Sequence, residues 1–195
     1  MRKIQLVLVA LIVLILSAFK ADHVITIYMI GDSTMSNKPL EGNNQERGWG
    51  HVLGSFFTED VRVENHAMNG RSSKSFIDEG RWETVVNKIR PGDYVFIQFG
   101  HNDEKPQPER HTDPGTTFDE NLRKFVRETR AKGGIPVLFN SIVRRNFGVN
   151  PDAVAADDIR PEKDEAVVEG DTLIDTHGKY LESPRNVAKE MDVGF

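Results

Sequence analysis

Short apolar runs alternate with amphipathic segments along the 195-residue chain. Four apolar runs predict buried strands, over residues 24–30, 61–64, 94–99 and 135–143. A helical spacing of apolar positions predicts helices over residues 48–57, 82–89 and 118–131. This alternation is typical of an α/β fold with a parallel sheet.

The last third of the chain has a less regular pattern. Residues 146–172 are polar, contain many acids and show no clear period, so we expect a long excursion over the surface there. Ser183-Pro184 is a typical N-cap and first-turn pair, and it predicts a helix that reaches Met191. A fifth strand is expected to begin at residues 193–195.

Residues 1–21 have the layout of a signal peptide. Arg2 and Lys3 precede an uncharged apolar run over residues 4–19, and small residues follow. We therefore expect residues 22–195 to form the domain, secreted or periplasmic, with no other membrane contact. An uncleaved anchor is the alternative, although the run is shorter than the ~20 apolar residues that a membrane span needs. Removal of residues 1–21 deletes three basic residues and no acid, which changes the net charge from -5 to -8.

Composition narrows the class of partner. The negative net charge gives no basic field for phosphate backbones, so we expect no nucleic-acid partner and favour a neutral small molecule or a polysaccharide. The chain has no cysteine, which excludes disulfides, Cys-ligated metals and thiol chemistry. Because no cluster of His and carboxylate ligands stands out, we predict neither a metal nor a cofactor. The sequence leaves the oligomeric state open.

Polar clusters follow three of the predicted strands. Ser33 comes after the first strand, Gly70 after the second and Asn102 after the third. In an open parallel sheet, ligands bind outside the carboxyl ends of the strands, so the topology delivers these distant residues to one rim. Each cluster alone is typical of an ordinary turn or loop. Their shared position is what indicates a site.

The three residues fit an acyl-transfer site. Ser33 can supply the attacking hydroxyl. The backbone N–H groups of Ser33 and Gly70 and the side-chain amide of Asn102 can donate hydrogen bonds to the oxyanion of a tetrahedral intermediate. A glycine at position 70 lets the backbone approach closely. What this set lacks is a base.

The clusters resemble, in order, the sequence blocks of the SGNH (GDSL-type) hydrolases. Within that superfamily the chain is most similar to rhamnogalacturonan acetylesterases, carbohydrate esterase family 12. The likeness spans residues 24–195, which correspond to about the first two-thirds of a family domain. The residues that carry it are Gly31-Asp32-Ser33-Thr34-Met35, Gly48-Trp49-Gly50, Asn69-Gly70-Arg71-Ser72-Ser73, Phe99-Gly100-His101-Asn102-Asp103 and Asp175-Thr176-His177-Gly178-Lys179-Tyr180.

This resemblance implies a three-layer α/β/α, flavodoxin-like fold that removes acetyl groups from a pectic polysaccharide without a metal. It implies that Ser33 is the nucleophile and that Gly70 and Asn102 complete the oxyanion hole. His101, which is adjacent to Asn102, is expected to line the pocket or to make a structural hydrogen bond.

The chain departs from the family at the catalytic acid and base. Family members carry both in an Asp-x-x-His block near the carboxyl terminus, and none of the six histidines here has Asp three residues before it. Asp175-Thr176-His177 has a spacing one residue too short, so we expect His177 to be a helix-entry or packing residue. We therefore predict that the domain is incomplete at its carboxyl terminus and that the 195-residue chain is inactive.

Three interpretations stay open at this point. The first is a piece of an exported acetylesterase that ends before its base. The second is an inactive or carbohydrate-binding remnant of the same fold. The third is a lipase or acyl-thioester hydrolase of the same superfamily, which differs only in the acyl group.

Overall fold

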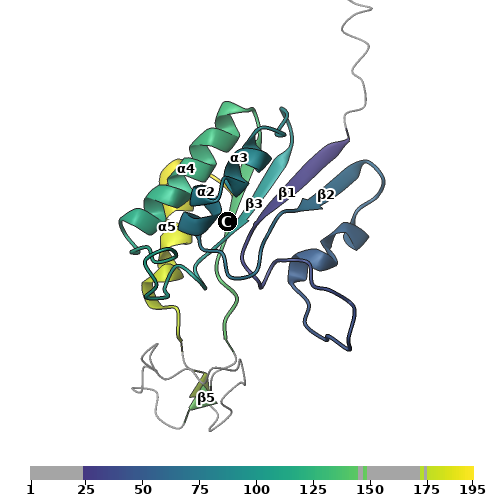
Figure 1. The fold of residues 1–195 in the computed structure, drawn as a ribbon. Helices are drawn as coiled ribbons and strands as arrows, with labels where there is room; N and C mark the ends of the chain where they lie inside the picture. The colour runs from purple at the N-terminus through teal and green to yellow at the C-terminus, as the bar shows by residue number, and fades with distance from the viewer. Residues whose placement is uncertain (1–23, 145–146, 149–171, 174) are drawn as a thin grey trace, which may run out of the picture.

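The computed structural model describes residues 24–144, 147–148, 172–173 and 175–195, and it places a parallel sheet at the centre (Figure 1). The strand order is β2-β1-β3-β4. In register, Ile27 of β1 faces Val63 of β2 and Tyr94 of β3, and Tyr94 in turn faces Ile135 of β4. The strands are β1 (Ile25–Gly31), β2 (Val61–Asn65), β3 (Tyr94–Gln98) and β4 (Ile135–Phe139).

All four predicted strands are confirmed, and one boundary is corrected. The fourth strand ends at Phe139 instead of residue 143. Polar groups explain the earlier end, since the backbone carbonyl of Asn140 accepts a hydrogen bond from the Gln98 side chain at 3.0 Å and the Ser141 hydroxyl donates to the carbonyl of Phe99 at 3.0 Å. The chain thus leaves the strand ladder to support the end of β3.

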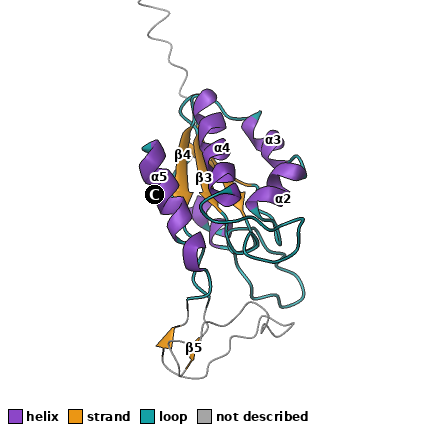
Figure 2. Cartoon of the chain, turned by 90° about the vertical axis from the view of Figure 1, so that its left-hand side faces the viewer, coloured by secondary structure: helices purple, strands orange, loops and turns teal. Residues whose placement is uncertain are grey.

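The helices lie beside the sheet, as Figure 2 shows. Side chains from all four join one buried cluster with Ile30, Ile97 and Leu138 of the sheet. A smaller cluster around Met29 and Met35 packs with Trp49 and Leu53, which belong to two 3₁₀ turns, η1 (Trp49–His51) and η2 (Leu53–Phe56). The helices are α2 (Ser73–Asp78), α3 (Arg81–Val86), α4 (Thr117–Ala131) and α5 (Glu182–Met191).

The connections follow the right-handed rule for parallel strands. From β1 the chain moves to one neighbour, β2, and then crosses back to β3 and β4 on the other side. Right-handed crossovers therefore put the β1–β2 connection on the opposite face from the later ones. This places the 3₁₀ turns against the smaller cluster and gives the sheet layers on both faces, in agreement with the predicted three-layer α/β/α class.

Three helix predictions need correction. Residues 48–57 form 3₁₀ turns, because Gly48, Gly50 and Gly54 weaken a helix. The helix predicted at 82–89 is α3, and the separate α2 before it was missed. In α5, Ser183 lies inside the first turn and is buried, and the N-cap position is Leu181.

The structure tests only part of the predictions for the two ends of the chain and for residues 146–172. Gly194 bridges Val137 in parallel, and its carbonyl accepts the Leu138 N–H at 2.9 Å, which is the start of strand pairing expected at residues 193–195. Most of the predicted excursion and the whole signal segment lie outside the described residues. Within the excursion, β5 (Phe147–Gly148) pairs antiparallel with β6 (Thr172–Leu173). Among the residues described, no helix has the length and apolar content to cross a bilayer.

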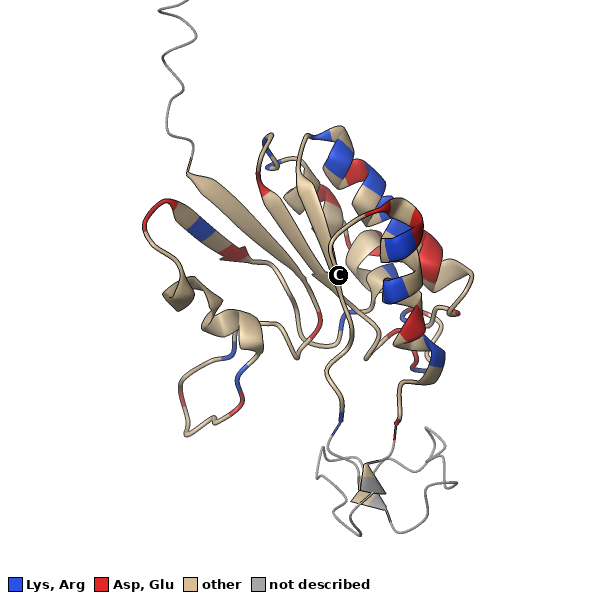
Figure 3. Cartoon of the chain, turned by 180° about the vertical axis from the view of Figure 1, so that it is seen from behind, with Lys and Arg blue, Asp and Glu red and all other residues tan. Residues whose placement is uncertain are grey.

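Charged residues of both signs follow the outer side of α4 (Figure 3). Arg123 of α4 pairs with Glu190 of α5 at 2.8 Å, and Lys124 pairs with Glu128 one turn further along α4. Exposed ion pairs contribute little stability, typically ~0.2–1 kcal/mol each. The apolar inner faces of these helices therefore provide most of the stabilisation.

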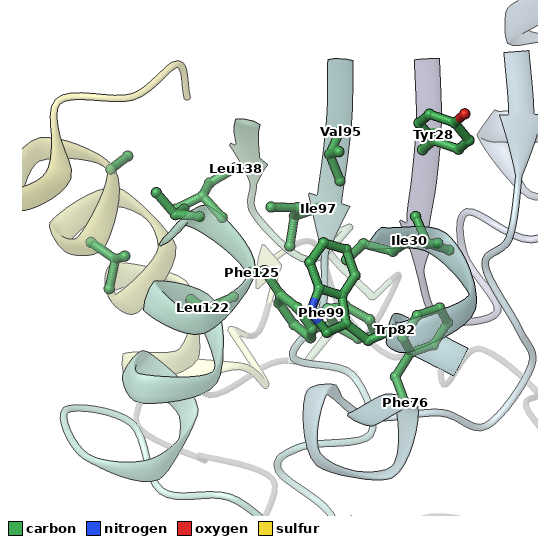
Figure 4. Close-up of a cluster of buried hydrophobic side chains, with 14 of the residues drawn as sticks. Tyr28, Ile30, Phe76, Trp82, Val95, Ile97, Phe99, Leu122, Phe125 and Leu138 are labelled. Carbon is green, nitrogen blue, oxygen red and sulfur yellow. The ribbon is translucent and has the colours of Figure 1, made fainter. Parts of the chain in front are cut away.

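Aromatic rings form the centre of the larger cluster (Figure 4). The Phe125 ring stacks on Phe99 with a centroid distance of 5.5 Å and meets Trp82 edge-on at 5.0 Å. Phe76 meets Phe99 at 5.4 Å. This chain of rings joins α2, α3 and α4 to the loop after β3, which is the loop that carries Asn102.

Replacement of Phe125 tests this arrangement. Phe125→Ala removes a fully buried ring, and we expect it to lower the free energy of unfolding by about 3–5 kcal/mol in urea denaturation. Phe56→Ala is the matched control, since Phe56 is 78% exposed, and its effect should stay within about 0.5 kcal/mol. Equal effects of the two changes would contradict the packing described.

Candidate active site

The loops that follow β1, β2 and β3 meet at one edge of the sheet (Figure 1). β1 lies between β2 and β3, so the direction of the connections reverses beside its carboxyl end. Such a switch point is where open parallel sheets bind ligands. Ser33, Gly70 and Asn102 belong to these three loops.

Ser33 lies in a tight turn at the end of β1. The backbone carbonyl of Asp32 accepts from the N–H groups of Met35 and Ser36 at 3.3 and 3.1 Å. The Asp32 side chain accepts from the N–H and the hydroxyl of Thr34, both at 2.8 Å. Ser33 itself is half-buried at the rim.

The Gly48-Trp49-Gly50 segment supports this turn from behind. The Trp49 N–H donates to the carbonyl of Thr34 at 2.9 Å. A Cβ atom at position 48 would lie 2.2 Å from the Ser36 carbonyl oxygen, and one at position 50 would lie 2.6 Å from that of Met35. Only glycine fits at this distance, which gives a physical reason for the motif.

Gly70 lies in a turn that is bound to the serine loop. Its φ of 74° is the left-handed conformation that favours glycine. The Met68 N–H donates to the carbonyl of Gly31 at 2.9 Å. The Asn69 side-chain oxygen accepts from the Ser36 hydroxyl at 2.6 Å and from the ammonium group of Lys38 at 2.8 Å.

Lys38 is a site residue that sequence reasoning missed. Its side chain is only 7% exposed, and its distance from the nearest carboxylate oxygen, on Glu46, is 3.6 Å. Buried lysines are uncommon unless they are paired. The signal in the sequence was only a lysine five residues after Ser33, which is typical of any solvated loop.

Asn102 reaches the same turn from β3. Its side chain is nearly buried, and its amide donates to the backbone carbonyl of Arg71 at 3.2 Å. A primary amide has two N–H groups, and among the described residues only this one acceptor is bound to the Asn102 amide. The structure therefore brings together the loops of Ser33, Gly70 and Asn102, joined by the Ser36–Asn69 and Asn102–Arg71 hydrogen bonds.

Asp103 anchors the loop after β3 to α2. Its carboxylate accepts from the N–H and hydroxyl of Ser73, from the N–H of Gly100 at 3.1 Å and from the hydroxyl of Thr112 at 2.9 Å. Burial raises its pKa to about 6, against the opposing effect of these hydrogen bonds, and the nearby charge of Asp32 adds to the rise.

Asp32 is the second buried acid of the site. Burial raises its pKa above the usual range, while hydrogen bonds from Thr34 and the charges of His177 and Arg144 oppose that shift. Its Oδ2 atom is buried, and within the described part of the chain no group hydrogen-bonds to it. Asp32 thus lies in the electrostatic field of His177 and Arg144, and its Oδ2 atom has no hydrogen bond among the described residues.

A buried charged network lies behind His101. Arg144 forms an ion pair with Glu104, and its Nε donates to the His101 ring at 3.1 Å. The His101 and His177 rings pack with a centroid distance of 4.6 Å. Glu104 and Arg144 were not singled out from the sequence, because a charged residue next to a polar block gives no sign of burial. The structural hydrogen bond considered for His101 is therefore present.

His177 is a packing residue at the start of η4 (Gly178–Tyr180), as expected. Its Nδ1 lies 2.8 Å from a Glu104 carboxylate oxygen, and its Nε2 lies 3.1 Å from the carbonyl oxygen of Ile142. Burial would raise the pKa of Glu104, but its hydrogen bond to His177 and the charges of His177 and Arg144 hold it below the usual range. Both ring nitrogens of His177 are therefore engaged in contacts with Glu104 and Ile142.

Asp175 lies near His177 in the sequence, and its carboxylate binds backbone N–H groups. Its carboxylate accepts from the N–H groups of His177 at 2.9 Å and Gly178 at 3.3 Å.

Within the described residues, no group of three or more potential metal ligands occurs. The predicted absence of a metal and a cofactor stays a prediction.

Comparison with known proteins identifies the family of the chain. Residues 29–192 match the GDSL-like Lipase/Acylhydrolase family. The chain belongs to this family. The predicted superfamily and its fold are thereby confirmed.

Two relatives carry the name that the sequence blocks suggested. The chain is 38% identical over 169 residues to the rhamnogalacturonan acetylesterase RhgT of Bacillus subtilis, an alignment that covers 87% of this chain and 62% of the relative. It is 40% identical over 78 residues to the rhamnogalacturonan acetylesterase of Emericella nidulans, covering 40% of this chain and 28% of that protein. The chain thus spans less than two-thirds of the relatives it matches.

Solved structures show the same fold. The crystal structure of YxiM from Bacillus subtilis superposes with a TM-score of 0.66 at 26% identity, over 87% of this chain and 42% of that one. The esterase EstA of Pseudoalteromonas gives a TM-score of 0.54 at 17% identity, over 87% of this chain and 74% of that one. At 17% identity, the likeness to EstA concerns the fold alone.

The raised pKa of Asp103 predicts a pH-dependent stability. An aspartate in the unfolded chain titrates near ~3.9, so the folded chain binds this proton more tightly. Its contribution to the free energy of unfolding is therefore fully present below about pH 4 and is lost as the pH rises through about 6, by ~3 kcal/mol in total.

Urea unfolding of the parent chain and Asp103→Asn between pH 4 and 7 checks this. The parent's stability relative to the variant should fall as the pH rises, because the asparagine does not titrate. Groups common to both chains cancel in this difference. A difference that rises with pH would show that the hydrogen bonds to Asp103 outweigh its burial.

Proposed function

We propose that this chain contributes the nucleophile and oxyanion hole of an exported acetylesterase that acts on a pectic polysaccharide. Ser33 attacks the acetyl carbonyl, and the N–H groups of Ser33 and Gly70 and the free amide N–H of Asn102 stabilise the oxyanion. The observation that carries the proposal is the convergence of three loops, in which Asn102 donates to the carbonyl of Arg71, next to Gly70.

The acyl group and the substrate are inferred from relatives. Two proteins named rhamnogalacturonan acetylesterases match the chain at 38% and 40% identity. An acetyl ester also needs no long apolar channel. Export is proposed from residues 1–21 alone, whose layout is that of a signal peptide.

The proposal places the general base outside residues 1–195. No Asp-x-x-His block occurs in the sequence, and His177 is engaged by Glu104 and Ile142. The same observations favour the second candidate, an inactive or carbohydrate-binding remnant. Reading the gene beyond codon 195 separates the two, since an in-frame Asp-x-x-His supports the esterase and an authentic stop codon supports the remnant.

Without a base, we expect negligible hydrolysis of p-nitrophenyl acetate by the 195-residue chain. The serine hydroxyl is a poor nucleophile near neutral pH, and removal of the base typically costs serine hydrolases orders of magnitude in rate. The release of p-nitrophenol is followed by its absorbance at about 400 nm over a period on the order of minutes. The Ser33→Ala chain gives the background rate. Turnover well above that background would mean that a base is present, and its loss in His177→Ala would identify His177.

In a chain that carries the Asp-x-x-His block, Asn102→Ala should lower kcat by on the order of 10² to 10³ with little change in KM, because one oxyanion donor is typically worth about 3–4 kcal/mol. His101→Ala is the matched control and should do less, since the structure shows His101 bound to Arg144. The assay is acetate release from an acetylated pectic oligosaccharide by variants confirmed to be folded. An unchanged kcat in Asn102→Ala would remove Asn102 from the oxyanion hole.

A further inference from the structure

Residues 68–71 form a tight turn that presents Gly70 at the edge of the sheet. The side-chain oxygen of Asn69 accepts a hydrogen bond from the Ser36 hydroxyl at 2.6 Å and one from the ammonium group of Lys38 at 2.8 Å. The Lys38 side chain is only 7% exposed, and a buried ammonium group needs such an acceptor. The serine loop therefore fixes the position of the turn through the Asn69 side chain.

The turn has the pattern of a type II β-turn. The Arg71 N–H donates to the carbonyl of Met68 at 3.3 Å, which closes the four residues. The φ of Gly70, the third residue, is 74°, whereas the φ of Asn69, the second residue, is negative. A positive φ at the third position alone distinguishes type II from type I and type I′ turns.

The hydrogen bond of the turn does not by itself select this form. A type I turn closes four residues with the same hydrogen bond, and glycine adopts a negative φ about as readily as a positive one. The two forms differ in ψ of the second residue and φ of the third, which amounts to a reversal of the peptide group between them. Because this peptide group joins Asn69 to Gly70, a further contact has to fix its orientation.

Arg71 makes that contact with its side chain. Its Nη1 donates to the backbone carbonyl of Asn69 at 2.9 Å, and its Nε donates to both carboxylate oxygens of Glu79, at 3.2 and 3.1 Å. Glu79 is the C-cap residue of α2, and its carboxylate also pairs with Arg81 at 2.6 Å. The guanidinium group is thus held at the end of α2 while it binds the carbonyl of Asn69.

The bound carbonyl decides where the Gly70 N–H points. A trans peptide group is planar, so its carbonyl and its N–H point in opposite directions. With the Asn69 carbonyl turned toward Arg71, the Gly70 N–H points away from the Arg71–Glu79 pair. Reversal of the peptide group would exchange the two, and the turn would then present an acceptor in place of a donor.

We propose that Arg71 is a positioning residue that holds the 68–71 turn in the type II form and so keeps the Gly70 N–H available to an oxyanion. Arg71 belongs to the same sequence block as Gly70, yet the proposed chemistry gives its side chain no part. A guanidinium group carries several donors in one plane, so it can bind a carboxylate and a carbonyl at the same time. This inference rests on the proposed function for the role of the Gly70 N–H, and it adds a residue that acts through the turn.

NMR of the isotopically labelled 195-residue chain distinguishes the two turn forms. In a type II turn the Gly70 amide proton lies close to the Hα of Asn69, and in a type I turn it lies close to the Asn69 amide proton. We expect a strong nuclear Overhauser effect for the first pair in the parent chain and none for the second. Because the measurement needs no turnover, a failure of the proposed function would appear only in acetate release and would leave this result unchanged.

Arg71→Met removes both side-chain contacts and keeps the backbone carbonyl that binds Asn102. We expect the ratio of type II to type I turn to fall by on the order of ten- to a hundredfold, as the loss of a hydrogen bond to a charged group predicts. The nuclear Overhauser effect between the amide protons of Asn69 and Gly70 should then appear.

Arg81→Met is the matched control. Arg81 pairs with the same Glu79 carboxylate and is 32% exposed, against 34% for Arg71, but within the described residues it makes no hydrogen bond to the turn. Its replacement should leave the turn in the type II form. Arg71→Ala is a second variant that removes the same donors without adding an apolar side chain at the surface.

The inference is overturned if the parent chain shows the type I pattern. It is also overturned if folded Arg71→Met keeps the type II pattern and loses only thermal stability, or if Arg81→Met changes the turn as far as Arg71→Met does. Where Arg71→Met does not fold, Arg71→Ala decides the question by the same comparison, and an unchanged type II pattern in that variant overturns the inference.

Discussion

Asp103 has no exposure to solvent, and its carboxylate accepts hydrogen bonds from three separate segments, at Ser73, Gly100 and Thr112. A buried carboxylate without such partners would cost several kcal/mol, so each segment is held where its donor reaches the acid. Ser73 is the first residue of α2, and it also accepts from Asn121 of α4. The orientation of Asn102, one residue earlier, follows from this anchor.

The charged network next to the anchor constrains the chain at a second point. Arg144 and His177 bracket the long segment between β4 and α5, and both bind Glu104, which directly follows Asp103. Burial of three charged or polar side chains is costly unless each is satisfied, and removal of one partner typically destabilises by about 3–5 kcal/mol. Residues far apart in the sequence are thus fixed to the loop that carries Asn102.

Much of this arrangement could be predicted from the sequence, because its causes are local. The four strands are apolar runs, α4 has a strong helical period, and the polar blocks directly follow strands. Residues 48–57 could not be assigned correctly, since the close approach of Gly48 to the Ser36 carbonyl depends on tertiary contact. Lys38, Glu104 and Arg144 were missed for a related reason. Charged residues are usually exposed, and only the fold shows that these are buried.

The arrangement separates two requirements of ester hydrolysis. Under the proposed function, stabilisation of the oxyanion depends on backbone and amide donors at the sheet edge, and Asp103, Asn69 and the carbonyl of Arg71 position the loops that carry them. Activation of the serine depends on a group with a free lone pair, and both ring nitrogens of His177 are engaged in structural contacts. Preorganised donors lower the barrier only when charge develops on the oxygen. Under the proposed function, the described residues therefore supply the first requirement, and His177 does not supply the second.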